Sequence, residues 1–444
     1  MLNHKTAAEV AAVFSNREIA PGSDPPQVQL LALSFCYPPL AYPRSIHVAR
    51  LLKYLQTSTV LVCGDETEAR RDETIDNGAE ACLKRCLRVP FEISSRQRFV
   101  NRLTHRICRP IWRHQNMAPD KYKTWEPAVL RELATYMREE SYSPDVLVTF
   151  GQPFSSHVIG LELKRRYELP WLAHFSDPWV DNPFNRYDAH TTKVNLRLER
   201  RVCESADVLA FTSPETLDLV MRKYPLNWKN KACVVPQSFD EALFPAVSAT
   251  TNPKLIVRYI GNFYGHRTPA PLIAALRRTL AQDTNSLANV CFELIGVCDR
   301  EMIRQNGGGD LPQGLLAVRS PVAYGESLRL MSEADGLLIV DAPGDVSVFL
   351  PSKLIDYAGA DRPLLGFTPS GTAATLIRQL GGTVADPSNI DEMSKSLEHF
   401  IDLLRLRRSM AHPDRWGNQR IRSQYEAPTV ARAFAEVLKG MLGK

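Results

Sequence analysis

The stretch FLPSKLIDY (residues 349–357) decides how this chain is interpreted. Pro351 suits the first turn of a helix, where its missing N–H is no loss and where free backbone N–H groups favour an anion. Lys353 and Asp356 are three residues apart, so on a helix they share one face. A lysine suits a phosphate and a carboxylate suits ribose hydroxyls, which indicates a nucleoside diphosphate site. The alternative is an exposed ion pair, and the surrounding sequence decides between the two.

Working outward from this stretch, apolar runs alternate with helical patterns. Runs such as VQLLALSF (28–35), DVLVTF (145–150) and GLLIV (336–340) are typical of strands that are buried on both faces of a parallel sheet. Helical patterns follow the runs, for example at 44–55 and 155–166. We therefore predict an α/β chain of two Rossmann-like, doubly wound domains that face a cleft.

The domain boundaries follow from breaker-rich and polar stretches. Residues 21–26 (PGSDPP) end a polar extension, and residues 249–254 (ATTNPK) mark the domain boundary. At 444 residues the chain is long enough for two such cores. We predict an N-terminal extension at 1–24, an N-terminal domain at 25–247, a C-terminal domain at 248–425, and a C-terminal helix at 426–444 that crosses back to the N-terminal domain.

Composition excludes several classes of protein. The net charge of +5 is small, so nucleic acid is not an expected partner. No apolar run is long enough to cross a membrane, and the N-terminus lacks the pattern of a secretory signal, so we expect a cytoplasmic protein. Cys82 and Cys86 lie four residues apart on a segment expected to be helical, but no second pair completes a zinc site. There is no Asp-x-Asp triplet either, so we expect no metal and no cofactor.

Polar residues and glycines gather where the predicted strands of the second half end. Ligands of open α/β sheets bind at the carboxyl ends of the strands. Arg267 begins a helix there and could bind a diphosphate together with Lys353, although a solvent-facing arginine is the alternative. Gly261 follows its strand directly and would let the backbone approach a ligand. The residues at these ends are Gly261, Asn262, His266, Arg267, Gly296, Pro321, Val322, Ser347, Phe349, Lys353 and Asp356.

The strand ends of the first half carry a second group of candidates. Asp177 lies at a strand end before a proline, where it could handle a proton or simply form a turn. His174 is next to the same end and could equally be a core histidine. The residues at these ends are Tyr37, Arg44, Gly151, His174, Asp177 and Trp179.

The segment 93–119 has no acidic residue and carries six arginines. Phe99, Leu103 and Ile107 recur at helical spacing within it, so the segment is a candidate for a basic amphipathic helix on an anionic membrane surface. The alternative is a helix that packs these three residues on its own domain and exposes its arginines.

Five stretches, in order along the chain, resemble one known family. The family's donor signature is similar to LPSKLIDYAGADRPLLG (350–366), and the first strand–loop–helix of its donor domain is similar to YIGNFYGHRTPAPLIAAL (259–276). A segment of its acceptor domain resembles LPWLAHFSDPW (169–179), and two further stretches resemble LERRVCESADVLAFTS (198–213) and ESLRLMSEADGLLIV (326–340). The chain thus resembles the retaining glycosyltransferases of GT-B fold, family four, from about Val28 to its end.

The resemblance implies how a nucleotide-sugar donor would bind. Arg267 and Lys353 would bind the diphosphate, and Asp356 would hold the ribose. The backbone around the donor would come from Gly261, Asn262, Gly296, Pro321, Val322, Phe349 and Leu350.

The resemblance also implies the acceptor side and the reaction. Asp177 or His174 would face the reacting sugar, and both alternatives stay open. Tyr37 and Arg44 would lie on the acceptor side. The implied reaction is metal-independent and retains the anomeric configuration, and the donor's own diphosphate helps to deprotonate the acceptor.

Some positions depart from the family pattern. The family usually has Glu where Asp356 stands, and many members have a second Glu at the position of Val348. His174 and Ser176 replace the more usual Asp and Arg. Residues 41–44 (AYPR) stand where a Gly-Gly pair is common.

These features together predict a glycosyltransferase that moves a sugar from a nucleotide-sugar to a saccharide. We expect a lipid-linked acceptor in cell-surface polysaccharide biosynthesis, with peripheral contact to the inner face of the plasma membrane through residues 93–119. Two alternatives remain: an inactive GT-B nucleotide-binding partner protein in glycan assembly, and a GT-B sugar-nucleotide epimerase.

Overall fold

The computed structural model describes residues 27–76, 78–91, 118–184, 187–245, 252–298, 300–410 and 414–443. They form two compact units. The first ends at Pro236 and also takes in the chain from Val430 onward, and the second runs from Gln237 to Thr429. The extension expected at 1–24 lies outside the described residues, as do the basic segment at 93–119, except for its last two residues, and half of the stretch at 249–254.

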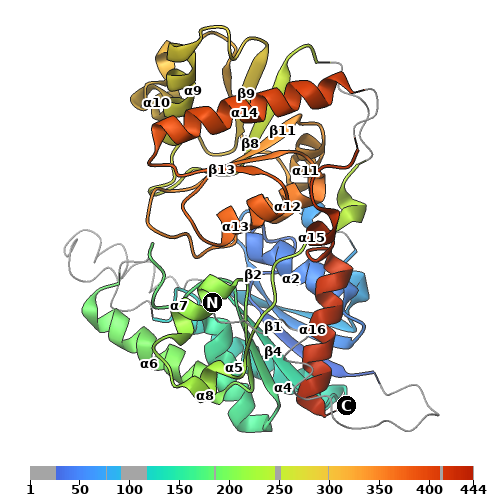
Figure 1. The fold of residues 1–444 in the computed structure, drawn as a ribbon. Coiled ribbons are helices and arrows are strands. Elements are labelled where there is room, and N and C mark those ends of the chain that lie inside the picture. The colour runs from blue at the N-terminus through green and yellow to red at the C-terminus, as the bar shows by residue number, and fades with distance from the viewer. Residues whose placement is uncertain are drawn as a thin grey trace. The chain divides into compact units, whose positions relative to one another are not determined.

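The first unit is built on a parallel sheet with the strand order β3-β2-β1-β4-β5-β6-β7. Helices cover both of its faces (Figure 1). The strands are β1 (Gln29–Ser34), β2 (Ser58–Glu66), β3 (Arg85–Phe91), β4 (Val146–Gly151), β5 (Trp171–Phe175), β6 (Val208–Phe211) and β7 (Ala232–Val234). The helices are α2 (Pro43–Tyr54), α4 (Glu126–Glu139), α5 (Ser155–Tyr167), α6 (Ala189–Ser205), α7 (Pro214–Met221), α8 (Leu226–Lys229) and most of α16 (Ala427–Leu442).

Side chains along each strand of this sheet alternate between two cores. In β1, Leu31 and Leu33 face a core that includes residues of α4, α5, α6 and α7, whereas Leu30 and Ala32 face a core that includes residues of α2 and α16. Because both faces are buried, the strand is an unbroken apolar run. Phe434 of α16 is fully buried in the second of these cores, so the expectation that the C-terminal helix returns to the first unit is confirmed.

The second unit repeats this plan with a smaller parallel sheet of order β10-β9-β8-β11-β12-β13. The strands are β8 (Leu255–Ile260), β9 (Val290–Ile295), β10 (Leu316–Arg319), β11 (Gly336–Val340), β12 (Leu364–Phe367) and β13 (Thr383–Ala385). The helices are α9 (Ala270–Gln282), α10 (Arg300–Gln305), α11 (Tyr324–Ser332), α12 (Ser352–Ala360), α13 (Thr372–Gln379), α14 (Ile390–Ser409) and α15 (Gln419–Ser423). One core includes residues of α9 and α14 and the other includes residues of α11, α12 and α13, so the prediction of two Rossmann-like α/β units is confirmed.

Each sheet has a point at which its strand order reverses. This point lies between β1 and β4 in the first unit and between β8 and β11 in the second. The connections on its two sides leave toward opposite faces of the sheet, which opens a crevice at the carboxyl ends of the strands. A ligand site is therefore expected at the residues that follow these four strands.

The prediction of a helix that contains Cys82 and Cys86 is wrong. Cys82 ends a short 3₁₀ helix (Glu80–Cys82), whereas Cys86 lies in the edge strand β3. In β3, Leu87, Val89 and Phe91 are buried and the residues that alternate with them are more exposed, which is the two-residue period of a strand with one buried face. A spacing of four residues therefore does not bring these two cysteines onto one helical face.

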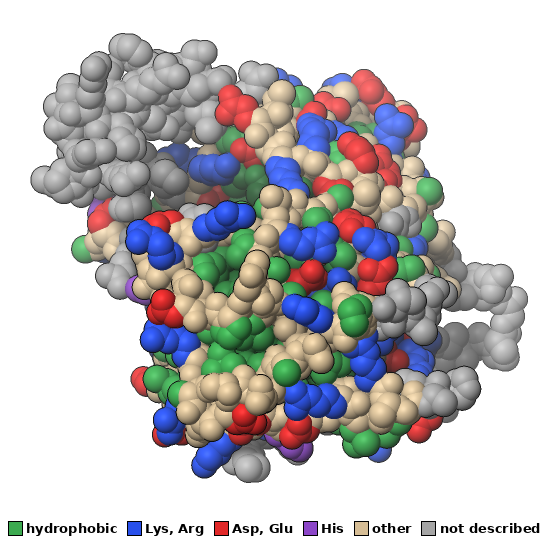
Figure 2. Space-filling model, turned by 90° about the horizontal axis from the view of Figure 1, so that it is seen from above, with side chains coloured by type: hydrophobic (Ala, Val, Ile, Leu, Met, Phe, Trp, Pro, Cys, Tyr) green, Lys and Arg blue, Asp and Glu red, His purple; other side chains and the backbone are tan. Residues whose placement is uncertain are grey.

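The surface of the described residues is mixed in charge. Figure 2 shows Lys and Arg side chains interspersed with Asp and Glu over the face of the molecule that it presents, with hydrophobic side chains between them. No helix among the residues that the structure describes is both long and apolar enough to cross a membrane.

Candidate functional site

Lys353 and Gly261 meet at the carboxyl end of the second sheet. Lys353 lies in the first turn of α12, and its Nζ donates a hydrogen bond of 2.5 Å to the hydroxyl of Tyr259 and lies 3.8 Å from the centre of that ring. Gly261, which follows β8, has a φ of +150°, and a Cβ there would come within 2.8 Å of Nζ. Only glycine therefore lets the backbone run beside this amine. Burial and the nearby Arg267 hold the pKa of Lys353 well below its usual value, although Asp341 opposes the shift.

Arg267 is fixed in the same place by a carboxylate that follows β11. Its Nε donates to Oδ1 of Asp341 at 3.1 Å, and its Nη2 donates to the same oxygen. Its Nη1 donates to the hydroxyl of Tyr264 at 3.3 Å. Burial lowers the pKa of Arg267, but Asp341, Tyr264 and Tyr259 together more than offset this, so that the pKa of Arg267 is raised. Lys353 and Arg267 are thus two cations on opposite sides of the point where the strand order reverses.

Asp341 was not among the residues predicted from the sequence. It is buried, and its Oδ2 accepts hydrogen bonds from the hydroxyls of Ser347 at 3.1 Å and Thr368 at 3.4 Å. Its position in the sequence could have identified it. Asp341 is the first residue after the strand GLLIV, just as Gly261 is the first residue after β8. In the sequence, the Asp-Ala-Pro that begins there is also typical of a turn.

Asp356 and Lys353 share a face of α12 by their spacing but form hydrogen bonds with different tyrosines. Asp356 is buried, and its Oδ1 accepts a hydrogen bond of 3.1 Å from the hydroxyl of Tyr324 at the start of α11. The next residue, Tyr357, accepts a hydrogen bond of 2.7 Å from the backbone N–H of Ile260. Helix α12 is thereby tied to the end of β8, which sets the distance of its first turn from Gly261.

The other candidates of the second unit form the backbone around these side chains. Gly296 follows β9 with a φ of +144°, and a Cβ there would lie 2.0 Å from the carbonyl oxygen of Gly261. The side chain of Asn262 accepts a hydrogen bond of 3.0 Å from Val297 N–H, which joins the two loops. The remaining predicted positions lie just before α11 or α12: Pro321 is exposed, Val322 and Phe349 are half-buried, and Leu350 is buried.

In the first unit, Arg44 is buried between two histidines. Its Nη1 is 2.9 Å from Nδ1 of His47, and its Nη2 is 2.9 Å from Nδ1 of His174 and 2.8 Å from the His174 carbonyl oxygen. Arginine can only donate, so both Nδ1 atoms accept and each neutral ring carries its proton on Nε2. Burial lowers the pKa of Arg44 to about 9, against the effect of Asp177. Burial and Arg44 hold the pKa values of both histidines well below the usual range.

Asp177 follows the same strand as His174 and remains partly exposed. Burial raises the pKa of its carboxyl to about 6, and Arg44 opposes the shift. The hydroxyl of Ser176 donates to the carbonyl oxygen of Gly151 at 3.0 Å, which ties the end of β5 to the end of β4. The structure thus brings Arg44, His174 and Asp177 together, with His174 fully buried and Asp177 nearer to solvent.

Tyr37 and Trp179 are core residues in this structure. Tyr37 is fully buried in the core that includes residues of α2, and the guanidinium of Arg88 lies 5.9 Å from the centre of its ring. Trp179 is fully buried and stacks on Phe154 with 4.5 Å between ring centres. Neither ring offers an exposed face for a sugar in this conformation.

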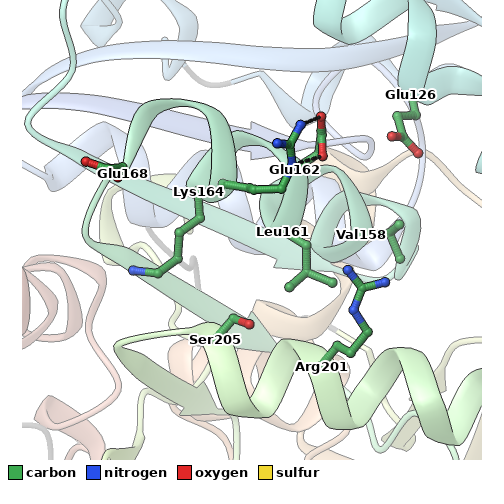
Figure 3. A pocket seen from close by; sticks show the side chains of 9 residues that line it. Glu126, Val158, Leu161, Glu162, Lys164, Glu168, Arg201 and Ser205 are labelled. Atoms are coloured by element: carbon green, nitrogen blue, oxygen red, sulfur yellow. Dashed lines mark hydrogen bonds and ion pairs between the residues drawn. The ribbon is translucent and has the colours of Figure 1, made fainter.

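A hollow of about 590 Å³ lies on the outer helices of the first unit (Figure 3). Residues of α5 and α6 line it, including Glu162, Lys164 and Arg201, and Glu162 is paired with Arg165. In a parallel α/β sheet the helices run against the strands, so Lys164, near the end of α5, belongs to the amino edge of the sheet. This hollow is therefore separate from the strand ends that carry the candidate site.

Metal binding finds no support among the described residues, because no group of three His, Cys, Asp or Glu side chains in them could hold a metal ion. The candidate site is instead a pair of cations with backbone N–H groups. Such a set of donors suits a phosphorylated ligand.

Comparison with known proteins gave matches of two kinds. Residues 46–237 match the family model of the glycosyl transferase 4-like domain. Comparison with the curated proteins gave no match. Similar solved structures include a sucrose-phosphate synthase from Thermosynechococcus elongatus, with a TM-score of 0.64, 14% identity, and coverage of 93% of this chain and 98% of that chain. They also include Anabaena Alr3699/HepE in complex with UDP-glucose, with a TM-score of 0.58, 14% identity, and coverage of 93% of this chain and 99% of that chain. A third is the lipopolysaccharide outer core galactosyltransferase WaaB, with a TM-score of 0.56, 11% identity, and coverage of 93% of this chain and 99% of that chain.

Proposed function

This chain carries a glycosyl transferase 4-like domain and has the GT-B fold, and from that premise we propose that it transfers a sugar from a nucleotide-sugar to a saccharide acceptor. The second unit would bind the donor and the first would bind the acceptor. The transfer would retain the anomeric configuration and would not need a metal. A similar fold in a complex with UDP-glucose supports a nucleotide-sugar donor.

One observation carries this proposal: Lys353 stands beside Gly261, with Arg267 near the lysine, at the point where the second sheet reverses its strand order. The lysine has a lowered pKa and forms no ion pair with the residues that the structure describes, so an incoming anion would favour its charged form. Arg267 can offer further N–H groups to the same anion. Asp356, one turn along α12, would hold the ribose.

In the first unit, Asp177 is the better candidate to face the reacting sugar, because it is partly exposed whereas His174 is fully buried. Arg44 and His174 would then fix the position of this carboxylate. The acceptor would be a lipid-linked saccharide of a cell-surface polysaccharide. The arginine-rich sequence at 93–119 supports peripheral contact with the inner face of the membrane.

A thermal-shift screen with UDP-, GDP-, ADP- and dTDP-sugars tests the donor site. A ligand that binds only the native state at about 100 times its Kd raises the free energy of unfolding by about 2.7 kcal/mol. Lys353→Ala should weaken donor binding by roughly 1.5–3 kcal/mol, the size of a charged hydrogen bond. The matched control is Lys439→Ala, which removes an exposed lysine of α16. Unchanged donor binding in Lys353→Ala would show that the site is assigned wrongly.

An inactive nucleotide-binding protein is the second candidate, since Val348 and the shorter Asp356 depart from the family pattern. Nucleotide-sugar binding without turnover, over a panel of saccharide acceptors, would favour it. Release of an epimerised sugar in the absence of any acceptor would instead indicate an epimerase.

A further inference from the structure

The carboxylate of Asp341 accepts hydrogen bonds from Arg267, Ser347 and Thr368 in the second unit. We propose that Asp341 is a positioning residue for the donor diphosphate: it holds the Arg267 guanidinium so that the remaining N–H groups of that arginine face the anion. This inference rests on the proposed function, because it concerns the same nucleotide site.

The hydrogen bonds of Arg267 show which of its N–H groups could bind a ligand. A guanidinium has five N–H groups. Oδ1 of Asp341 takes the Nε–H and one Nη2–H, and the hydroxyl of Tyr264 takes one Nη1–H. Among the residues that the structure describes, no other acceptor bonds to Arg267, so two N–H groups remain, one on each terminal nitrogen. A pair of this kind is suited to two oxygens of one phosphate.

The other oxygen of Asp341 fixes the carboxylate itself. Oδ2 accepts from Ser347 and Thr368, and Ser347 in turn accepts a backbone hydrogen bond of 3.2 Å from Thr372 at the start of α13. One buried carboxylate therefore connects the segments that follow β8, β11 and β12. Arg267 cannot turn away from the strand ends without breaking this network.

The negative charge of Asp341 also affects the two neighbouring cations. Lys353 and Arg267 are close enough for Arg267 to lower the pKa of the lysine, and Asp341 acts in the opposite direction. Two cations in a partly buried place repel each other, and the nearby carboxylate of Asp341 offsets that repulsion. Asp341 thus holds Arg267 by hydrogen bonds and offsets the charge that this arginine places near Lys353 before the anion arrives.

Titration calorimetry on Asp341→Asn tests this inference without any acceptor. We would measure UDP against UMP, and likewise GDP against GMP and ADP against AMP, since each pair differs only by the β-phosphate. The asparagine keeps the shape and can still accept from Arg267, but its charge is gone. We expect the advantage of the diphosphate over the monophosphate to fall about tenfold, while monophosphate affinity stays within about twofold.

Asp335→Asn is the matched control. Asp335 stands just before β11, at the opposite end of the strand, where its side chain accepts a hydrogen bond of 2.7 Å from Ile256 N–H. This change should lower stability and leave the diphosphate advantage intact.

Three results would overturn the inference or its premise. An unchanged advantage in Asp341→Asn would make Asp341 a structural residue only. Tighter diphosphate binding in that variant would show that the carboxylate competes with the ligand for Arg267. A wild type that binds no nucleotide would overturn the proposed function, and the inference with it.

Discussion

Asp177 combines partial exposure with an altered pKa, and this predicts how stability changes with pH. Its pKa is about 6 in the folded protein and 3.8 in the reference state, so the native state binds more protons between these values. Its contribution to stability is therefore complete below the lower pKa and is lost as pH rises through about 6. We expect Asp177→Asn to raise the free energy of unfolding at neutral pH, by an amount that grows as pH rises through this range. Urea unfolding at a series of pH values would measure it, and a gain independent of pH would contradict the burial effect.

Lys353 gives the opposite pH dependence. Burial and Arg267 lower its pKa, so the folded protein binds this proton less well than the unfolded chain. The charged lysine therefore costs stability at neutral pH, and the cost disappears as pH rises toward the usual pKa of a lysine. We expect Lys353→Met to be more stable than the wild type at neutral pH, with a smaller gain at alkaline pH, and to lose donor binding. Lower stability of this variant at all pH values would show that the bond to Tyr259 outweighs the burial of the charge.

At the scale of elements, helix α16 is a specific test of the first unit. Phe434 is fully buried in the core that α16 shares with α2 and β1. Its replacement by alanine removes a large apolar side chain and leaves a cavity, for which a loss of about 3–5 kcal/mol is typical. Lys439→Ala on the same helix should change the free energy of unfolding by less than about 0.5 kcal/mol. Chemical denaturation measures both, and equal effects would show that the helix does not pack as described.

Strands that are buried on both faces could be predicted from the sequence, because their apolar runs are continuous. β1, β4 and β11 were found in this way at or near their observed bounds. β3 was missed because it is an edge strand with polar residues at alternate positions. Short segments of this kind have a weak pattern, and only pairing with β2 decides their structure.

The candidate site could be predicted only where the sequence showed the ends of the strands. Gly261, Lys353 and Arg267 follow from that rule together with residue chemistry. The partners of these residues did not follow, because Asp341 is 74 positions from Arg267 and Tyr259 is 94 positions from Lys353. Contacts at such separations depend on the register of the sheet and on helix packing, which single-sequence patterns do not contain.

For the whole molecule, the distribution of cores predicts how the two units respond to change. The two cores of the first unit contain no residue from the second unit, and the reverse also holds among the described residues. The nucleotide site proposed above lies entirely in the second unit. Ligand binding stabilises the part of the protein that must be folded to form the site.

We therefore expect two transitions in differential scanning calorimetry, with UDP or another bound nucleotide raising only the one that belongs to the second unit. Phe434→Ala should lower the other transition and leave the nucleotide-dependent shift intact, because the removed ring belongs to the first unit. Lys353→Ala should reduce the shift at the same nucleotide concentration without lowering the transition of the first unit. The two variants control for each other, because Phe434→Ala should change only the transition of the first unit and Lys353→Ala should change only the nucleotide-dependent shift. If Phe434→Ala moved the nucleotide-sensitive transition, the units would unfold as one cooperative structure, and the separate cores would not be independent sources of stability.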